Sequence, residues 1–350
     1  MSATITVPVS LADIETLAAR ALRASNVSAA NAKAVARSIA HAERDGQQIV
    51  GLSYLPTYCA HAACGKVDGF AEPALDVLSP AVIRVDARTG FAHPALALGL
   101  PALDEAARVF GVATLAIGNS YACGSLGYFV EELAERGLVA LMFANASPSI
   151  APHGGKVPFF GTNPFAFATP RSGEAPLVID QSSSVVAKVA VIDAHERGAT
   201  LPPGWALDAD GQPTTDAAAA MAGSLSPIGG YKGASLALMI DFFAGGLTCS
   251  NFSFEASSFG DCDGGPPRTG QFVIAFDPLM FSGLKFVDRT ETLLTAMQSE
   301  PDVRVPGTRR TDARRRNQAG IAVPTALWES IQRLAGDRAV MPGEGTEACI

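Results

Sequence analysis

The sequence predicts an α/β protein built on a mixed sheet, with both parallel and antiparallel strands. Strand-like and helical segments alternate between residues 81 and 144, which is typical of an α/β fold. No GxGxxG sequence stands where a strand leads into a helix, which argues against the usual doubly wound dinucleotide fold. Two apolar segments, 165–169 and 177–180, flank a turn at 171–174, and this pattern predicts an antiparallel hairpin.

The individual elements follow from apolar spacing and from turn residues. Ser10 followed by Asp13 resembles a capping box, and an apolar stripe at helical spacing runs from Leu11 to Leu22. The same reasoning predicts helices at 29–45, 94–110, 125–136, 285–298 and 325–335, strands at 82–86, 112–117, 138–144 and 271–276, a turn at 208–211, and a long apolar helix opened by residues 229–233.

Composition limits the class of protein. The 350 residues are 48% hydrophobic, enough for one large domain or two to three smaller ones. A net charge of −8 argues against binding to nucleic acid or to anionic membranes. The N-terminus lacks a basic start, and the most apolar stretch, 234–248, is short and interrupted by Asp241, so neither a signal peptide nor a membrane span is predicted. The six cysteines form no CxxC pair and no His/Cys metal spacing, so we expect reduced thiols in a cytoplasmic protein and no metal site.

Two segments have the character of an anion site. The first is the glycine-rich loop, which contains two glycine turns, His153-Gly154-Gly155 and Gly161-Thr162-Asn163-Pro164. These turns expose backbone N–H groups, which suit a pyrophosphate. A purely structural glycine-rich loop is the alternative. The second segment is the basic run at 309–316, which is either a solvated helix face or a patch close to phosphate.

The glycine-rich loop also carries a family resemblance. The sequence resembles the lactate/malate dehydrogenase-like family of NAD(P)H oxidoreductases that lack a Rossmann fold. Within that family it is most similar to the Δ1-piperideine-2-carboxylate/Δ1-pyrroline-2-carboxylate reductases. Six separated motifs carry the resemblance in family order, at residues 44–46, 153–170, 208–216, 229–233, 270–271 and 305–309.

The resemblance implies a two-domain homodimer that binds NADPH or NADH. Residues 1–75 with 305–350 would form a helical dimerisation domain whose Ala- and Leu-rich N-terminal helix faces are buried between subunits. Residues 76–304 would form the mixed α/β nucleotide domain. Free N–H groups at a turn or helix start bind phosphates. The cofactor-binding residues so implied are His153, Gly161, Thr162, Asn163, Pro164, Asp180, Ser182, Ser183, Ser184, Gly230, Lys232, Gly233 and Arg309. For His153 a structural role is favoured, and Lys232 is otherwise an exposed lysine at a helix start.

Three positions depart from the family pattern. The family usually has Ser-His-Gly and then an Arg three residues after that Gly, where this chain has Val50 at the His position and Tyr54 at the Arg position. A second family motif usually supplies a histidine, whereas residues 119–124 contain none, and Ala122 stands there. The resemblance therefore implies the loss of two acid/base imidazoles and of a guanidinium suited to a substrate carboxylate.

Four residues remain as candidates for catalysis. Tyr54 and Tyr121 would offer aromatic faces to a cation, worth about 0.5–2 kcal/mol each, or would simply pack as half-buried rings. Cys123 is an acid or nucleophile, or else an inert small hydrophobic residue. Lys188 is a proton donor, a phosphate contact or a solvated surface lysine.

Three functions remain open on these grounds. The first is NAD(P)H-dependent reduction of a C=N bond in a cyclic imine, because a protonated imine already carries the proton that a ketone must receive. The second is a 2-oxo or 2-hydroxy acid dehydrogenase with replaced catalytic groups. The third is a repurposed scaffold, either a non-redox enzyme or a silent binding protein.

Overall fold

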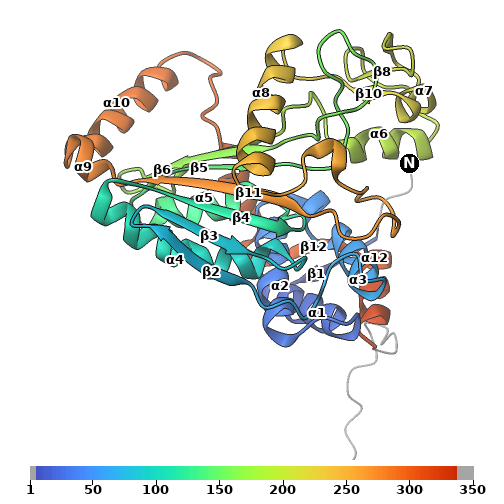
Figure 1. Ribbon diagram of the computed structural model, residues 1–350, viewed down its shortest axis with the longest axis horizontal. Helices are drawn as coiled ribbons and strands as arrows, with labels where there is room; N and C mark the ends of the chain where they lie inside the picture. The colour runs from blue at the N-terminus through green and yellow to red at the C-terminus, as the bar shows by residue number, and fades with distance from the viewer. Residues whose placement is uncertain (1–4, 337–350) are drawn as a thin grey trace, which may run out of the picture.

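The computed structural model describes residues 5–336, and within them the main sheet has seven strands in the order β2-β3-β4-β11-β5-β6-β7. β3 and β4 pair in parallel and the other neighbours are antiparallel, which confirms the mixed sheet (Figure 1). The predicted hairpin is present as β6 and β7. The strands are β2 (Ala74–Ser79), β3 (Val82–Asp86), β4 (Val112–Ser120), β5 (Val139–Ala144), β6 (Phe165–Thr169), β7 (Leu177–Gln181) and β11 (Thr269–Phe276).

Helices cover both faces of this sheet. The two helices α4 (Ala92–Phe110) and α5 (Leu126–Glu135) bury their apolar sides against one face. Gly99 permits the close approach of α4, because a Cβ there would lie 2.7 Å from the Leu115 side chain. On the other face, α8 (Tyr231–Asp241) and the π-helical turn η3 (Phe242–Gly246) contribute Ile240 and Phe243 to a smaller apolar cluster. The long apolar helix predicted after residue 229 is therefore present, as α8 and the π-helical turn that continues it.

The two ends of the chain form a helical unit beside the sheet. Its helices are α1 (Leu11–Ala24), α2 (Ala29–Arg44), α3 (Leu55–Ala63) and α12 (Thr325–Leu334), and they share one apolar core. The predicted cap is confirmed, since Ser10 Oγ accepts a hydrogen bond of 3.1 Å from the Asp13 amide. An unpredicted strand pair, β1 (Thr6–Val9) with β12 (Ile321–Pro324), joins the N-terminal and C-terminal segments.

This arrangement confirms a helical domain drawn from both ends of the chain, whereas the exact boundaries at 75/76 and 304/305 stay predictions. Residues 1–4 and 337–350 of the predicted domain lie outside the described residues. The Ala- and Leu-rich faces of α1 and α2 are buried inside this unit. They are therefore packed within the chain, and the predicted homodimer stays a prediction.

A third, smaller unit was not predicted, apart from the turn at 208–211. Three two-residue strands, β8 (Ala206–Leu207), β9 (Pro213–Thr214) and β10 (Ser224–Leu225), form a small sheet. They pack with α6 (Lys188–Glu196) and α7 (Ala217–Ala222) around a separate core. Asp208 Oδ1 closes the predicted turn by accepting hydrogen bonds of 2.9 Å from the amides of Asp210 and Gln212.

The remaining helices are short or peripheral. α9 and α10 lie at the opposite end of the sheet from the small third unit (Figure 1). Within the described residues, no helix is long and apolar enough to cross a membrane. The short or peripheral elements are the helices α9 (Pro278–Ser282), α10 (Lys285–Gln298) and α11 (Thr308–Arg316), and the 3-10 turns η1 (Gln48–Val50), η2 (Leu52–Tyr54), η4 (Ser253–Glu255) and η5 (Asn317–Ala319).

Candidate active site

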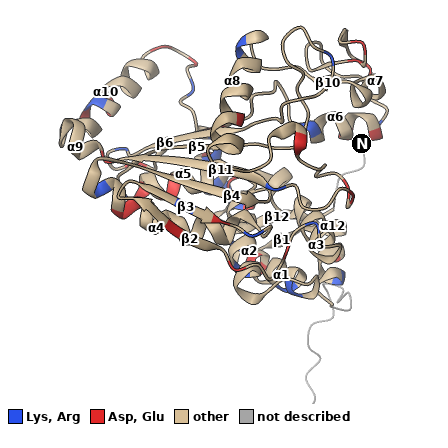
Figure 2. Ribbon diagram, in the orientation of Figure 1, with Lys and Arg blue, Asp and Glu red and all other residues tan. Residues whose placement is uncertain are grey.

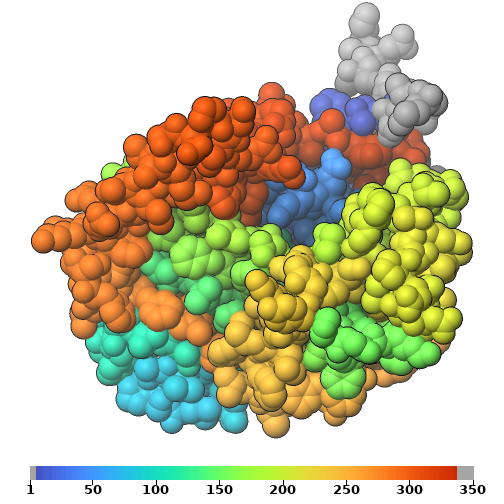
Figure 3. Space-filling view, turned by 90° about the horizontal axis from the view of Figure 1, so that it is seen from above, coloured from blue at the N-terminus to red at the C-terminus, as the bar shows by residue number. Residues whose placement is uncertain are grey.

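A cavity of about 300 Å³ lies where the three units meet, along the edge of the main sheet that is formed by the ends of its strands. The strand pairings place the ends of β4, β5 and β7 and the starts of β6 and β11 at this same edge. Figure 3 shows the molecule hollowed between its lobes, with N-terminal segments in blue at the back of the hollow. The lining residues are Val50, Tyr54, Tyr58, Ala122, Cys123, Gly124, Leu126, Ala144, Asn145, Ala146, Ser147, Ser149, Thr162, Pro164, Ser182, Ala187, Lys188, Phe259 and Gln271.

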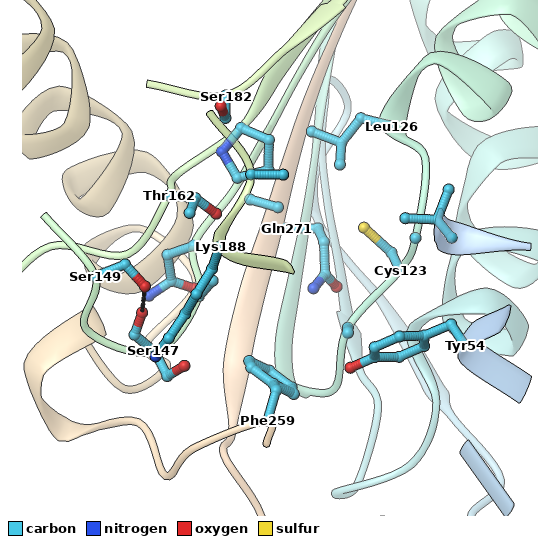
Figure 4. A pocket seen from close by; sticks show the side chains of 18 of the residues that line it. Tyr54, Cys123, Leu126, Ser147, Ser149, Thr162, Ser182, Lys188, Phe259 and Gln271 are labelled. Carbon is cyan, nitrogen blue, oxygen red and sulfur yellow. Dashed lines mark hydrogen bonds between the residues drawn. The ribbon is translucent and has the colours of Figure 1, made fainter. Parts of the chain in front are cut away.

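The three positions that depart from the family pattern all line this cavity. Val50 and Tyr54 arrive on η1 and η2, and Ala122 lies in the loop that follows β4. Among the described residues that line the cavity, none is a histidine or a carboxylate, and Lys188 is the only charged one. Figure 4 shows Lys188 and Tyr54 approaching the cavity from different elements. The cavity is therefore poor in conventional acid/base groups.

The cofactor segments predicted from the sequence come together beside the cavity. The Ser183 amide donates to the Thr162 carbonyl at 2.8 Å, and the Ile228 amide donates to the Ser183 carbonyl at 2.9 Å. These bonds join the glycine turn, the end of β7 and the segment that leads into α8. Thr162, Pro164 and Ser182 reach the cavity surface.

Several other predicted cofactor residues lie behind that surface. Asn163 is fully buried, and its side chain donates to the Ala237 carbonyl at 2.8 Å and accepts from Ser253 Oγ at 3.1 Å. Ser183 is buried as well, with its hydroxyl bonded to the Asn163 carbonyl at 2.8 Å. Ser184 Oγ donates to the Val186 carbonyl at 2.7 Å. These side chains shape the turn and leave only backbone groups for a ligand.

Gly161 shows how tightly the turn is built. A Cβ at this position would lie 2.4 Å from the Ala146 carbonyl oxygen. Any residue other than glycine would therefore force the backbone to move. Gly230 and Gly233 stand at the start of α8, whose helix cap is Gly230, and Lys232 is exposed there. The ring of exposed His153 lies 5.9 Å from that of Tyr231, so His153 belongs to the same surface and not to the cavity.

A second hollow, of about 500 Å³, lies on the other side of the β7 end. Asp180 lines it, together with Arg304, Arg309 and the turn at Gly307. Asp180 Oδ2 accepts hydrogen bonds of 2.8 Å from Ser125 Oγ and from the Gly127 amide, which fixes the start of α5 beside the cavity. Arg304 and Arg309 have no hydrogen-bond or ion-pair partner among the described residues.

Only part of the basic run at 309–316 fits either of the two roles considered for it. Arg310 and Arg314 are not solvated, because both pair with buried Asp45, at 3.0 and 2.6 Å. Arg314 also contacts Glu131 at 2.5 Å. Arg309 remains exposed at the second hollow. Elsewhere, Lys and Arg are interspersed with Asp and Glu (Figure 2).

The catalytic candidates have different environments. Tyr54 and Lys188 line the cavity, whereas Tyr121 is fully buried behind it, with its hydroxyl bonded to His61 Nδ1. Burial, and the charge of Asp180, raise the pKa of Cys123 to about 12, so its thiol is protonated at neutral pH. This environment favours the inert alternative for Cys123.

Gln271 and Phe259 are among the residues of the cavity wall to which sequence reasoning gave no role. Gln271 belongs to a family motif but was given no role, and its Oε1 is buried without a hydrogen-bond partner among the described residues. Its Nε2 donates to the Tyr121 carbonyl at 3.1 Å, which holds the amide in place. Phe259 comes from a loop with no predicted element, and its ring lies 5.2 Å from that of Tyr121. Among the described residues, no group of His, Cys, Asp and Glu side chains could hold a metal ion.

Comparison with known proteins agrees with this geometry. The family model described as malate/L-lactate dehydrogenase matches residues 9–332. A (2R)-3-sulfolactate dehydrogenase (NADP(+)) from Chromohalobacter salexigens is 47% identical over 330 residues, covering 94% of this chain and 98% of that protein. A Δ1-pyrroline-2-carboxylate reductase from Ancylobacter novellus is 40% identical, with 94% and 97% covered.

Solved structures agree with the fold. The crystal structure of Δ1-piperideine-2-carboxylate reductase from Pseudomonas syringae pv. tomato superposes with a TM-score of 0.90 at 39% identity, covering 94% of this chain and all of that one.

Proposed function

This chain belongs to the malate/L-lactate dehydrogenase family, and from that premise we propose that it reduces the C=N bond of a cyclic imine with NAD(P)H. It is an NAD(P)H-dependent oxidoreductase, as its relatives are. The observation that carries the choice of C=N is the cavity itself, in which Val50 and Ala122 replace side chains that could transfer a proton. Hydride addition to an iminium gives a neutral amine directly, whereas hydride addition to a ketone creates an alkoxide that must be protonated.

The polar groups of the cavity suit a protonated ring nitrogen. Gln271 Oε1 is a buried acceptor that lacks a donor, and an iminium N–H would satisfy it. The Tyr54 ring adds an aromatic face for the positive charge. Lys188 is available to pair with a substrate carboxylate in place of the guanidinium that Tyr54 replaces. We therefore expect weaker dependence on that carboxylate than a bidentate arginine would give.

The cofactor fits across the end of β7. When bound, NAD(P)H supplies the hydride, and we place its nicotinamide in the 300 Å³ cavity and its phosphates along the glycine turn. The missing Cβ of Gly161 allows close approach to that backbone. The second hollow would then hold the adenosine end, and unpaired Arg304 and Arg309 there favour the additional phosphate of NADPH.

We also propose a homodimer, although on a different surface from the one the sequence indicated. The faces of α1 and α2 are buried within the chain. By contrast, Phe159, Leu238, Phe242 and Phe254 are exposed and surround an apolar groove of about 270 Å³ beside α8. Exposed apolar patches of this kind are commonly buried when two protein subunits associate.

A second candidate function is a 2-oxo or 2-hydroxy acid dehydrogenase. The 47% identity to a sulfolactate dehydrogenase favours it, and it would need another proton donor near the cavity. Both functions are tested by following NADPH oxidation with Δ1-pyrroline-2-carboxylate, with Δ1-piperideine-2-carboxylate and with small 2-oxo acids. The proposal expects turnover of at least one imine and near-inertness toward the acids. Efficient reduction of a 2-oxo acid with no reduction of the imines would replace the proposed function with the second one.

A further inference from the structure

The cavity has two walls of different chemistry, and Figure 4 shows their labelled residues on either side of Gln271. One wall comes from the loop after β5, the glycine turn and the segment from β7 into α6, and the other comes from η1, η2 and the segment from β4 into α5. The polar wall consists of Ser147, Ser149, Thr162, Ser182 and Lys188. The apolar wall consists of Val50, Tyr54, Ala122, Cys123 and Leu126.

The apolar wall is also electrically neutral. Burial raises the pKa of Tyr54, and burial together with the charge of Asp180 raises the pKa of Cys123 to about 12. Both groups therefore stay protonated and uncharged at neutral pH. A substrate carboxylate turned toward this wall would lose its hydration without gaining an ionic partner, which is unfavourable.

The parts of the apolar wall are held together by contacts within the chain. Buried Glu43 on α2 accepts a hydrogen bond of 2.7 Å from the Leu52 amide, which lies between Val50 and Tyr54 in the sequence. A Cβ on Gly124 would lie 4.0 Å from the Val50 Cβ, so η1 packs directly against the loop that follows β4. The wall therefore presents one continuous apolar surface to a molecule in the cavity.

The polar wall offers a carboxylate only a weak partner. Lys188 is the first residue of α6 and is exposed to solvent. An ion pair with an exposed ammonium is weakened by water and by dissolved salt. The bidentate contact that an arginine at position 54 would make inside the cavity is absent. A carboxylate on the substrate therefore contributes little to binding.

We propose that the preferred substrate is a cyclic imine whose C=N carbon carries an apolar group, such as an aromatic ring, in place of a carboxylate. Val50, Tyr54 and Ala122 are the residues that select this group. The inference rests on the proposed function and names the substrate class of the same site. Apolar contact over a shaped surface, with few polar groups to fix orientation, is the usual way in which a cavity of this composition recognises a ligand.

The two walls also orient such a substrate. With the cofactor phosphates along the glycine turn, the nicotinamide lies toward the polar wall, and the substrate lies between it and the apolar wall. Gln271 stands between the walls, so an iminium N–H bonded to its Oε1 leaves the group on the neighbouring carbon against the apolar wall. The imine carbon gains the hydride, the π pair of the C=N bond moves onto the protonated nitrogen, and NADPH is oxidised as the iminium becomes a neutral amine.

Two substrates with the same ring test the proposal on the wild-type enzyme. 2-Phenyl-1-pyrroline and Δ1-pyrroline-2-carboxylate differ only in the group on the imine carbon. With saturating NADPH, kcat/KM should be higher for the phenyl compound by about tenfold, which is the effect of burying roughly 55 Å² more apolar surface. This comparison needs no variant and does not depend on how any variant folds.

Tyr54→Arg should shift the preference toward the carboxylate. The guanidinium would pair with the carboxylate and would remove a neutral aromatic surface from the wall. The ratio of kcat/KM, phenyl over carboxylate, should fall by at least about tenfold, mainly through KM. Comparing ratios between enzymes cancels the intrinsic reactivities of the two imines.

Phe281→Arg is the matched control, because it places the same charge on a ring that is 66% exposed on α9, outside the cavity. It should leave the ratio within about twofold of wild type. Circular dichroism and gel filtration show whether each variant is folded.

The outcomes separate the substrate class from the function beneath it. A wild type that uses the carboxylate as efficiently as the phenyl compound, or more so, would overturn the proposal while imine reduction stands. A folded Tyr54→Arg variant that keeps the wild-type ratio would overturn it too. Failure of the wild type to reduce either imine would overturn the proposed function, and the substrate class with it.

Discussion

Asp45 at the end of α2 holds α11 in place, and removing its charge is a severe test of the packing around the cavity. Its carboxylate accepts from Arg310 at 3.0 Å, from Arg314 at 2.6 Å and from Arg44 at 2.9 Å, and its side chain is 2% exposed. Burial alone would raise the pKa of Asp45, but the hydrogen bonds from Arg314 and Arg44 prevail and lower it from 3.8 to about 2.

The expected loss in Asp45→Asn follows from that shift. A change from 3.8 to about 2 corresponds to about 2.5 kcal/mol, and leaving buried Arg310 short of its counter-charge adds to this cost. We expect the free energy of unfolding in urea at pH 7 to fall by about 2–4 kcal/mol. Because the folded pKa is the lower one, the contribution is present above pH 3.8 and is lost as pH falls through about 2.

The pH dependence of the free energy of unfolding provides a second test of this prediction. Wild type should lose stability over this acidic range faster than Asp45→Asn does, so the two curves converge. Asp312→Asn is the matched control, since its pair with Arg315 is exposed and 3.4 Å long, and it should cost less than about 0.5 kcal/mol. An Asp45→Asn variant within about 0.5 kcal/mol of wild type would refute the reasoning.

Three other predictions concern the cavity and the second hollow. The combined variant Val50→His, Ala122→His and Tyr54→Arg should gain reduction of small 2-oxo acids over wild type, by more than it gains on imines, because only the ketone needs an external proton. Arg309→Ala should raise the KM for NADPH by about tenfold and that for NADH far less, because a phosphate contact is lost; equal increases would count against the placement. Cys123 should resist alkylation by iodoacetamide at pH 8, as its pKa of about 12 requires, and rapid labelling in the folded protein would contradict this environment.

Periodicity predicted the central sheet well, because its strands have strong local patterns. The hairpin at 165–181 has a clear turn at 171–174, and the strand at 271–276 is a mostly buried apolar run that ends at Asp277 and Pro278. The pairs β1–β12 and β8–β10 escaped prediction, since strands of two to four residues have no periodicity to detect and depend on distant partners. The buried ion pairs of the basic helix α11 were not predicted for a similar reason, because only the fold brings Asp45 to Arg310 and Arg314.

The candidate site was predictable where a motif stood in one segment. The glycine turn at 161–164 and the positions of Val50, Tyr54 and Ala122 all fall at the cavity or its edge. The contact between His61 and Tyr121 was not predictable, because 60 residues separate them and neither spacing nor composition links them. Phe259 likewise enters from a loop without regular structure.

One comparison tests most directly whether the cavity favours C=N over C=O reduction. The measurement is kcat/KM of the purified wild type, with NADPH, for Δ1-piperideine-2-carboxylate and for an open-chain 2-oxo acid of the same carbon number. We expect a preference for the imine of at least about 100-fold, since Val50 and Ala122 offer no group to protonate an alkoxide. Equal values, or a preference for the 2-oxo acid, would contradict it.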